Sequence, residues 1–334
     1  MRRPLILAAA AALTLGSLAA CSNSPASSSS NSASGGSGTI KIALIAKANA
    51  SDYWTSVKDG AMAAGKDLGA TVTFNGPDTE TQGDEQLNEL QSAVNAKPSG
   101  IGFAPQDGAQ DGAPAILQQA QQAGIPVVAF DTPVNESDIP IATVASDNQG
   151  IGAMAAQQMV QLTGGTGKIG IIVNGLTGTA AARQQGFQDY LKQNAPNMQV
   201  VSVQNGESDP AKSRDKAAAI LQANPDLVGL FGTDDDSVIA CGAEVQADGL
   251  SGKVKVVGVD ASSDEIAMVK SGEIDGAVTQ NPYNIGYQTV QILVDAAKGQ
   301  MPTDKNIVSP SVWYTASNMN DPTVAQVLGQ ASAG

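Results

Sequence analysis

The feature that most constrains the fold is a repeated alternation that begins at Ile40 and continues to Lys298. Short apolar runs, which are typical of strands buried on both faces, alternate with segments whose apolar residues recur at the three-to-four spacing of a helix. Strands that alternate with helices predict parallel sheets with helices packed on both faces. The alternation therefore predicts an α/β protein built from doubly wound parallel sheets.

The number of apolar runs indicates how many sheets the chain forms. We expect strands at residues 40–45, 71–75, 100–104, 126–130, 141–145, 168–173, 199–203, 227–231, 255–259 and 276–279. We expect helices at residues 53–68, 83–96, 114–123, 148–162, 179–193, 210–223, 236–247, 263–271 and 285–298. About ten strands exceed what one small doubly wound sheet holds, and 334 residues exceed the usual size of one domain. We therefore predict two Rossmann-like lobes.

Charge and composition exclude several classes of partner and of chemistry. Asp and Glu outnumber Lys and Arg by 32 to 18, which gives a formal net charge of -14 and argues against a nucleic-acid partner. The chain has no His, so Ser-His-Asp, Cys-His and His-rich zinc sites are excluded. A hydrolase with Asp234 and Asp260 as paired carboxylates stays open in principle, but nothing in the sequence selects it. We expect a protein that is not an enzyme and needs no cofactor.

The N-terminal segment is typical of an export signal. Two arginines follow Met1, an apolar run covers residues 5–15, and small residues lead up to Cys21. The run is shorter than the roughly 20 apolar residues that cross a bilayer, so we expect residues 1–20 to be removed. The sequence Leu-Ala-Ala-Cys resembles the bacterial lipoprotein box, in which the Cys carries the lipid. The alternative is an ordinary secretory peptide in which Cys21 is incidental.

The segment after Cys21 is typical of a tether. Residues 22–38 contain nine Ser and three Gly and have no charge, so they have too little apolar surface to offset the entropy of ordering. We expect residues 21–38 to link a lipid on Cys21 to the folded domain, outside the cytoplasm on the outer face of the cell membrane. The second cysteine, Cys241, fits a small buried residue on a helix.

Polar residues follow most of the predicted strands. Ligands of doubly wound sheets bind outside the carboxyl ends of the strands, so these residues are the candidates for a binding site. They are Lys47, Tyr53, Trp54, Pro105, Gln106, Asp107, Asp131, Thr132, Ser146, Asp147, Asn148, Arg183, Ser208, Asp209, Thr233, Asp234, Asp235, Asp236, Asp260, Gln280 and Asn281. Such a set is suited to hydrogen bonds with hydroxyl groups and to stacking on a ring.

Tyr53 and Trp54 are adjacent at the start of a predicted helix. Neighbours on a helix point about 100° apart, so both cannot face the core. We expect at least one of them to stack on a sugar ring in the cleft, and packing between the lobes is the alternative.

Two other motifs have simpler explanations. The glycine-rich run that ends at Lys168 lacks the spacing of a phosphate loop and indicates a turn. Asp234, Asp235 and Asp236 lack the alternating spacing of a calcium loop. We expect Asp234 to face the ligand, the residues after it to cap a helix, and no metal to be bound.

Several spaced motifs occur in the order found in one known family. They lie at residues 52–60, 124–131, 145–148, 178–183, 256–260 and 280–286. The chain resembles the type I periplasmic binding proteins of ABC transporters, in their ribose- and allose-binding branch, over residues 41–312. The resemblance implies two Rossmann-like lobes joined by a three-crossing hinge. It also implies stacking by Tyr53 and Trp54 and hydroxyl binding by a polar set, which comprises Asp131, Arg183, Asp234, Asp260 and Gln280.

Departures from the ribose-type pattern bear on the ligand. Thr132 stands where ribose binders have Arg, and Asp234 stands where they have Asn. Lys47 matches the allose-type members, and Ser208 replaces an aromatic residue. The ligand is therefore expected to contact Lys47 and Thr132 as well, and a pentose, a hexose and a sugar alcohol all stay open. With Asp131, Asp234 and Asp260 facing two cations, we expect a neutral to slightly negative pocket that disfavours phosphorylated sugars and sugar acids.

The resemblance also implies the domain boundaries and the function. The N-terminal lobe is expected at residues 39–145 plus 281–308, and the C-terminal lobe at 146–280 plus 309–330. We expect a monomeric substrate-binding lipoprotein that closes on a neutral sugar or polyol and delivers it to an ABC permease and its ATPase. The alternatives are an extracytoplasmic sensory receptor or a furanosyl autoinducer-binding protein of the same fold.

Overall fold

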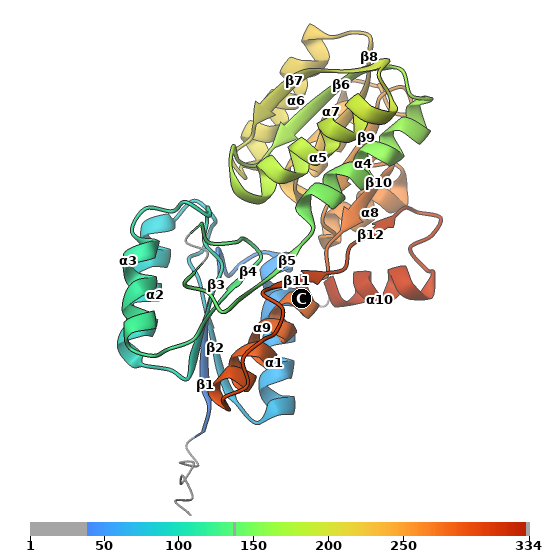
Figure 1. Ribbon diagram of the computed structural model, residues 1–334. Helices are drawn as coiled ribbons and strands as arrows, with labels where there is room; N and C mark the ends of the chain where they lie inside the picture. The colour runs from blue at the N-terminus through green and yellow to red at the C-terminus, as the bar shows by residue number, and fades with distance from the viewer. Residues whose placement is uncertain (1–38, 136–137, 332–334) are drawn as a thin grey trace, which may run out of the picture. The chain divides into compact units, whose positions relative to one another are not determined.

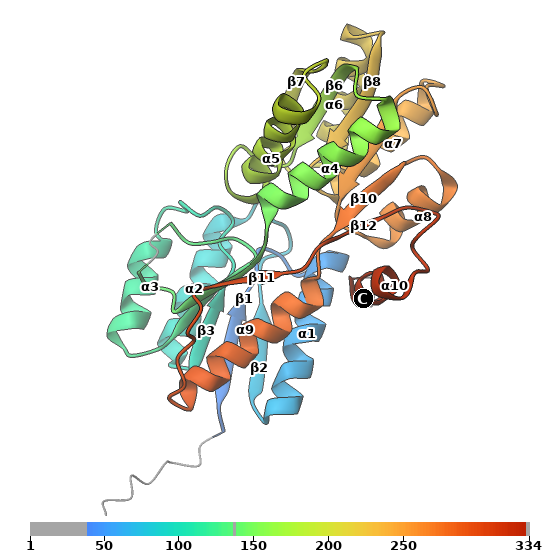
Figure 2. The same cartoon turned by 45° about the vertical axis from the view of Figure 1, so that its right-hand side comes forward.

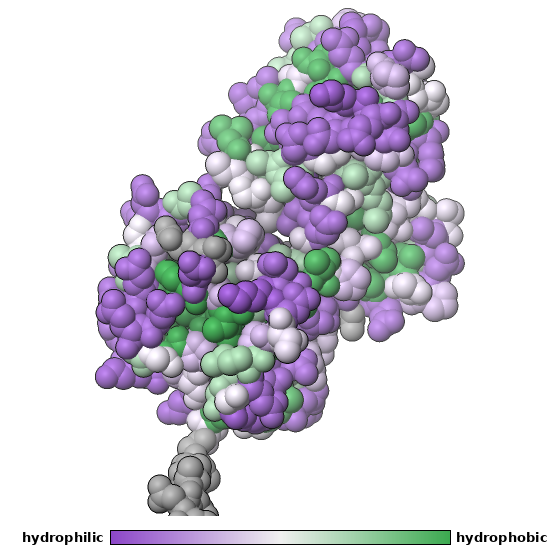
Figure 3. All heavy atoms as spheres, in the orientation of Figure 1, coloured by the Kyte–Doolittle hydropathy of each residue, from purple (hydrophilic) through white to green (hydrophobic). Residues whose placement is uncertain are grey.

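The computed structural model describes residues 39–135 and 138–331. From Thr39 onward the chain forms one compact unit that holds two six-stranded sheets (Figure 1). The predicted signal peptide, the tether at residues 21–38 and the predicted lipid site at Cys21 lie outside the described residues. Polar side chains cover most of the face shown in Figure 3, with apolar side chains scattered among them.

The first lobe contains one parallel sheet with helices on both faces. Its strands, in spatial order, are β11 (Asn306–Ser309), β5 (Ala142–Ser146), β4 (Val127–Phe130), β3 (Gly100–Phe103), β1 (Lys41–Ile45) and β2 (Thr71–Asn75). Helices α1 (Asp52–Leu68) and α9 (Pro282–Ala297) pack on one face, and α2 (Gly83–Ala96) and α3 (Ala113–Gln122) pack on the other. The buried residues form one apolar cluster on each face.

The second lobe repeats this strand order. Its strands, in spatial order, are β12 (Val312–Tyr314), β10 (Gly276–Thr279), β9 (Lys255–Val259), β8 (Leu227–Gly232), β6 (Gly167–Val173) and β7 (Met198–Asn205). Helices α4 (Asn148–Thr163) and α5 (Gly178–Asn194) pack on one face, and α6 (Pro210–Ala223), α7 (Asp235–Ala247) and α8 (Ser263–Ser271) pack on the other. A further helix, α10 (Pro322–Ala331), follows β12. The prediction of two doubly wound lobes is confirmed, although β12 runs antiparallel to β10.

The chain passes between the sheets in three places. It leaves the first sheet after β5, returns between β10 and α9, and leaves again between β11 and β12. Because Ser146 at the end of β5 pairs with Ser309 at the end of β11, two of these segments start side by side (Figure 2). Adjacent connecting segments allow the lobes to rotate as bodies about one hinge.

Close helix crossings position the helices that lead into the region between the lobes. A Cβ atom on Gly60 of α1 would lie 1.9 Å from the carbonyl oxygen of Tyr283 in α9. A Cβ atom on Gly152 of α4 would lie 1.9 Å from the carbonyl oxygen of Arg183 in α5. Only glycine permits backbones to approach this closely, so both crossings depend on it.

Candidate functional site

A polar cavity of about 330 Å³ lies between the lobes, at the carboxyl ends of the strands. Its lining comprises Lys47, Ala48, Ala50, Ser51, Tyr53, Trp54, Asp78, Thr79, Glu80, Thr81, Asp131, Asn174, Thr179, Arg183, Ser208, Asp234, Asp235, Asp236, Asp260 and Gln280. Of the residues expected to contact the ligand, Lys47, Tyr53, Trp54, Asp131, Arg183, Asp234, Asp260 and Gln280 line this cavity and Thr132 does not. The other candidates that follow strands but do not line it are Pro105, Gln106, Asp107, Ser146, Asp147, Asn148, Asp209, Thr233 and Asn281. Ser208, the residue predicted to replace an aromatic, also lines the cavity and belongs to the second lobe, as do Arg183 and Asp234.

Asp131 is the centre of a buried hydrogen-bond network in the first lobe. Lys47 Nζ lies 2.7 Å from its Oδ2 atom, and the Tyr53 hydroxyl donates to Oδ1 at 2.6 Å. Burial opposes ionisation, but the Lys47 cation and these hydrogen bonds hold the pKa of Asp131 below its usual value. Burial likewise opposes the charge on Lys47, yet Asp131 and Glu80 raise its pKa. Asp131 and Lys47 are therefore both charged.

Thr132 has a different position from the one predicted. Its side chain is buried, and its hydroxyl donates to Asp131 Oδ2 at 2.9 Å. It is absent from the cavity lining, so its contact runs to the Asp131 carboxylate. A threonine that follows a buried Asp can fix the carboxylate in this way because its short side chain reaches back along the chain.

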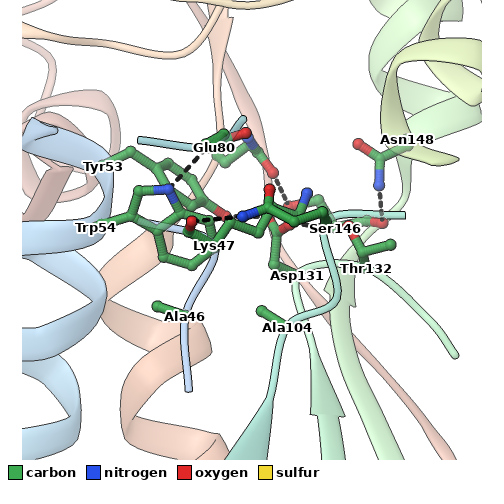
Figure 4. Close-up of polar contacts among 12 residues, drawn as sticks. Ala46, Lys47, Tyr53, Trp54, Glu80, Ala104, Asp131, Thr132, Ser146 and Asn148 are labelled. Carbon is green, nitrogen blue, oxygen red and sulfur yellow. Dashed lines mark hydrogen bonds and ion pairs between the residues drawn. The ribbon is translucent and has the colours of Figure 1, made fainter. Parts of the chain in front are cut away.

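The two adjacent aromatics are held in different ways. Burial and the Asp131 carboxylate raise the pKa of Tyr53 well above its usual value, so its hydroxyl stays protonated and donates. Trp54 is 1% exposed and packs edge-on against Tyr53 and Phe130, with ring centroids 5.0 and 6.3 Å away. Its Nε1 atom donates to Glu80 Oε1 at 2.7 Å (Figure 4). Trp54 thus belongs to the core of the first lobe and also lines the cavity.

Glu80 is a lining residue that sequence reasoning missed. It lies in the loop between β2 and α2, as do Asp78, Thr79 and Thr81. The sequence prediction places no site residue in the loop after Asn75. Its acidic and hydroxyl residues were the available signal.

Arg183 is fixed by three contacts within the second lobe. Its Nε atom donates to Asn148 Oδ1 at 2.9 Å, and its Nη1 atom donates to the Thr233 carbonyl oxygen at 2.7 Å. Nη1 also lies 3.9 Å from Asp260 Oδ2. Gly152 packs against the carbonyl oxygen of Arg183 and so fixes the Arg183 backbone. The side-chain contacts fix the guanidinium group. Its planar fork lines the cavity with little freedom to move.

Asp260 occupies the position in the second lobe that Asp131 has in the first. Both follow the fourth strand of their sheet, with φ of 92° and 61°, in the left-handed region that non-glycine residues seldom adopt. Gln280 Nε2 donates to Asp260 Oδ1 at 2.6 Å, and Ser146 donates to Gln280 Oε1 at 2.9 Å. Burial raises the pKa of Asp260, although Arg183 and Gln280 act against this. Backbone strain of this kind concentrates at functional sites.

Three acids stand at the start of α7. Asp234 accepts from the backbone N–H of Ser237 at 3.1 Å, so Asp234 itself caps the helix and the prediction that the following residues cap it is wrong. The cause is its extended backbone, which places the carboxylate over the first turn. Burial and neighbouring acids raise the pKa of Asp234 to about 7 and that of Asp236 to about 6. The same causes raise the pKa of Asp235 well above its usual value.

The lining is more acidic than the sequence predicted. Its carboxyl groups belong to seven residues, namely Asp78, Glu80, Asp131, Asp234, Asp235, Asp236 and Asp260. Its cations are Lys47 and Arg183. The neutral to slightly negative balance was predicted from three acids and two cations, and the loop after β2 and the first turn of α7 add Asp78, Glu80, Asp235 and Asp236 to the lining. The raised pKa values of Asp234, Asp235 and Asp236 favour their uncharged forms.

Cys241 is a residue of α7 whose side chain lies in the apolar core of the second lobe, where burial raises the pKa of its thiol, as its predicted packing role requires. In the described part of the chain, no helix combines the length and the apolar character that a membrane span needs.

Comparisons with known proteins agree with this architecture. The D-allose-binding periplasmic protein of Escherichia coli is 29% identical over 273 residues, which cover 79% of this chain and 87% of the relative. The solved ABC transporter solute-binding protein of Agrobacterium vitis with bound D-fucose is 32% identical with a TM-score of 0.81, covering 86% of this chain and 99% of that one. A second protein of that organism, bound to α-D-tagatopyranose, is 30% identical with a TM-score of 0.80, and the match covers 87% and 99% of the two chains.

These relatives are named for binding and transport and not for catalysis, as expected of a chain that is not an enzyme. The sequence profile described as periplasmic binding protein domain matches residues 42–301, which is more than half of the chain. The resemblance in the sequence is thereby confirmed, and the chain belongs to the periplasmic binding protein domain family.

Proposed function

We propose that this protein captures a sugar or sugar alcohol in the cavity between its lobes and delivers it to an ABC permease. The observation that carries the proposal is the convergence of hydroxyl-binding groups from both lobes on one cavity of about 330 Å³. Buried groups that hydrogen-bond hydroxyls reject ligands that would leave them unpaired. Relatives named for allose, fucose and tagatose support a monosaccharide-sized ligand.

The proposed roles follow from the contacts of each residue. Asp131 and Asp260 accept hydrogen bonds from ligand hydroxyls, and Arg183 donates to ligand oxygens. Gln280 and Asp234 add further hydrogen bonds at the second lobe. Tyr53 and Trp54 form the aromatic wall, while Lys47 and Thr132 hold the Asp131 carboxylate in place.

Closure of the lobes is the proposed means of capture. Ligand contacts to both lobes exist only when the lobes are close, so the ligand shifts the equilibrium by its differential affinity for the closed form. Contacts between the lobes beside the cavity support this reading. Asp52 at the start of α1 accepts from the N–H and hydroxyl of Ser263 at 2.9 and 2.8 Å, and Thr177 donates to Asp107.

The proposed place of action is the outer face of the cell membrane, with a lipid on Cys21 as the anchor. The lipoprotein-like sequence before Cys21 supports the anchor, and the uncharged tether after it supports a domain held clear of the bilayer. The partner for delivery is a permease with its ATPase.

A thermal-shift screen of the purified protein tests this function. The panel comprises D-allose, D-ribose, D-arabinose, D-fucose, D-tagatose and sugar alcohols. A ligand at 100 times its dissociation constant adds about 2.7 kcal/mol of stability. We expect at least one to raise the melting temperature of the native protein and not that of Asp131→Asn. The control is Asp226→Asn, which removes an exposed acid outside the cavity. A shift that is the same in all three proteins would contradict binding in the cavity.

A further inference from the structure

Ser146 connects the hinge to one of the acids that line the cavity. It is the last residue of β5, where the chain first leaves the first sheet, and its side chain is buried. Its hydroxyl donates to Gln280 Oε1 at 2.9 Å, and Gln280 Nε2 donates to Asp260 Oδ1 at 2.6 Å. Gln280 follows β10, where the chain returns to the first lobe. These hydrogen bonds therefore link two of the three connecting segments to Asp260.

The direction of each hydrogen bond in this chain follows from the groups at its ends. The Asp260 carboxylate accepts, so the Gln280 amide presents its nitrogen to Asp260 and its oxygen to Ser146. The Ser146 hydroxyl therefore has to donate. An amide nitrogen has two hydrogens, and because one of them is donated to Asp260, the other is available to a ligand oxygen in the cavity. The orientation of Gln280 thus determines which groups the ligand meets at this point.

The main chain of Ser146 is linked to a second ligand-binding group by a separate path. Asn148 Nδ2 donates to the Ser146 carbonyl oxygen at 3.2 Å (Figure 4), and Asn148 Oδ1 accepts from Arg183 Nε at 2.9 Å. A substitution of the Ser146 side chain removes the hydroxyl that holds Gln280 and retains this carbonyl oxygen. It therefore interrupts the path to Asp260 and leaves the path to Arg183 in place.

Ser309 is the counterpart of Ser146 in the third connecting segment. The two residues pair with each other at the ends of β11 and β5, and both are buried. The Ser309 hydroxyl donates to the Asn281 carbonyl oxygen at 3.2 Å and accepts from Asn284 Nδ2 at 3.1 Å. Both of these partners lie at the start of α9, and neither lines the cavity. The two serines are therefore matched in position and burial, but the hydroxyl of Ser146 is linked to a cavity acid and that of Ser309 to a helix of the first lobe.

We propose that Ser146 is a positioning residue for the ligand, because its hydroxyl holds Gln280 in the conformation in which the amide and Asp260 contact the ligand together. This inference rests on the proposed function, in which Asp260 and Gln280 bind ligand oxygens. With the Ser146 hydroxyl in place, the Gln280 side chain is ordered when the protein folds and not when the ligand binds. Ordering one such side chain during binding lowers the affinity by about two- to tenfold.

Calorimetry with substitutions of Ser146 tests the inference. The probes are D-allose, D-ribose, D-arabinose, D-fucose and D-tagatose, and the one that binds the native protein most tightly is used with every variant. We expect Ser146→Ala to weaken its binding by about fivefold, because Gln280 Oε1 loses its donor and the side chain becomes free to turn. Threonine keeps the hydroxyl, suits a strand, and has room for its methyl group in a cavity of about 280 Å³ beside Ser146. Ser146→Thr should therefore bind within about twofold of the native affinity.

A double variant separates positioning from a general effect on the hinge. Gln280→Met removes the amide and retains a side chain of similar length, so Ser146→Ala should cause no further loss of affinity in that background. The matched control is Ser309→Ala, which removes the other buried hydroxyl of the paired serines and should bind within about twofold of native. A fivefold loss that persists in the Gln280→Met background, or an equal loss in Ser309→Ala, would overturn the positioning role.

The failure of this inference differs from the failure of the proposed function. If the native protein binds one of the sugars and Ser146→Ala binds it equally well, the inference alone is overturned. If none of the sugars binds to the native protein, the proposed function fails and the inference fails with it. The melting temperature of each variant, measured without sugar, shows that the affinities compared are those of folded proteins.

Discussion

Removal of the Asp131 carboxylate tests the buried network on which the site depends. Lys47 and Asp131 are 7% and 6% exposed, and the carboxylate also accepts from Tyr53 and Thr132. Asparagine suits the left-handed φ of 61° at this position, so Asp131→Asn removes charge without added backbone strain. Loss of one partner of a buried ion pair destabilises the folded state by about 3–5 kcal/mol. Because asparagine keeps an amide oxygen that can accept hydrogen bonds, we expect the lower end of this range, about 3 kcal/mol. This corresponds to a fall in melting temperature of about 6–12 °C.

The partner substitution separates this account from a general loss of packing. Lys47→Met removes the cation that Asp131→Asn leaves unpaired, so the double variant should be less destabilised than the sum of the two single variants. The coupling should exceed about 1 kcal/mol in a denaturant-unfolding cycle. Ligand binding, measured by calorimetry, should stay weakened by at least about 30-fold in Asp131→Asn and in the double variant. Additive stabilities, or normal binding by Asp131→Asn, would refute the reasoning.

Three further predictions concern other parts of the molecule. Burial raises the pKa of Asp234 to about 7 from 3.8, so the folded state takes up a proton between these values. Its contribution to the stability of the folded state is present below about pH 4 and is lost as the pH rises through about 7. In thermal melts, Asp234→Asn should reduce the dependence of the melting temperature on pH in this range. An unchanged dependence would contradict the assignment of the raised pKa to Asp234. The pKa of Asp131 is lowered, so its contribution to stability is lost only as the pH falls below this range. Gly152→Ala should force α4 away from α5, displace Arg183 and weaken binding by at least about tenfold in calorimetry, whereas normal affinity would show that the crossing does not position Arg183. Cys21→Ala should abolish fatty-acid labelling of the chain, and labelling that persists would exclude the lipoprotein reading.

The fold was largely predictable because strands buried on both faces appear as uninterrupted apolar runs. Strands β2, β9 and β10 begin and end where the sequence predicts. The missed strands, β11 and β12, are only four and three residues long, and two of the four residues of β11 are exposed. Their pairing partners lie far away in the sequence, so local periodicity contains no signal for them. Helix α9 begins at Pro282 and not at Ile285 because Asn281 caps it.

The site was predictable in its position and less so in its charge. The rule that ligands bind beyond the carboxyl ends of strands located Asp131, Arg183 and Asp260. The rule did not distinguish Thr132 from the residues that line the cavity. The Thr132 side chain donates to Asp131, and the direction of a side chain in a loop depends on the backbone. Glu80 escaped because its position depends on a hydrogen bond from Trp54, a residue 26 positions away.

The central claim is that a polyhydroxylated ligand binds between the lobes at the residues that line the cavity. A crystal structure of the protein with the tightest-binding sugar or sugar alcohol tests it most directly. We predict that the ligand lies in the cavity, with hydrogen bonds to Asp131, Arg183 and Asp260. A ligand bound elsewhere on the protein, or bound in the cavity without contact to Asp131 and Arg183, would contradict the claim.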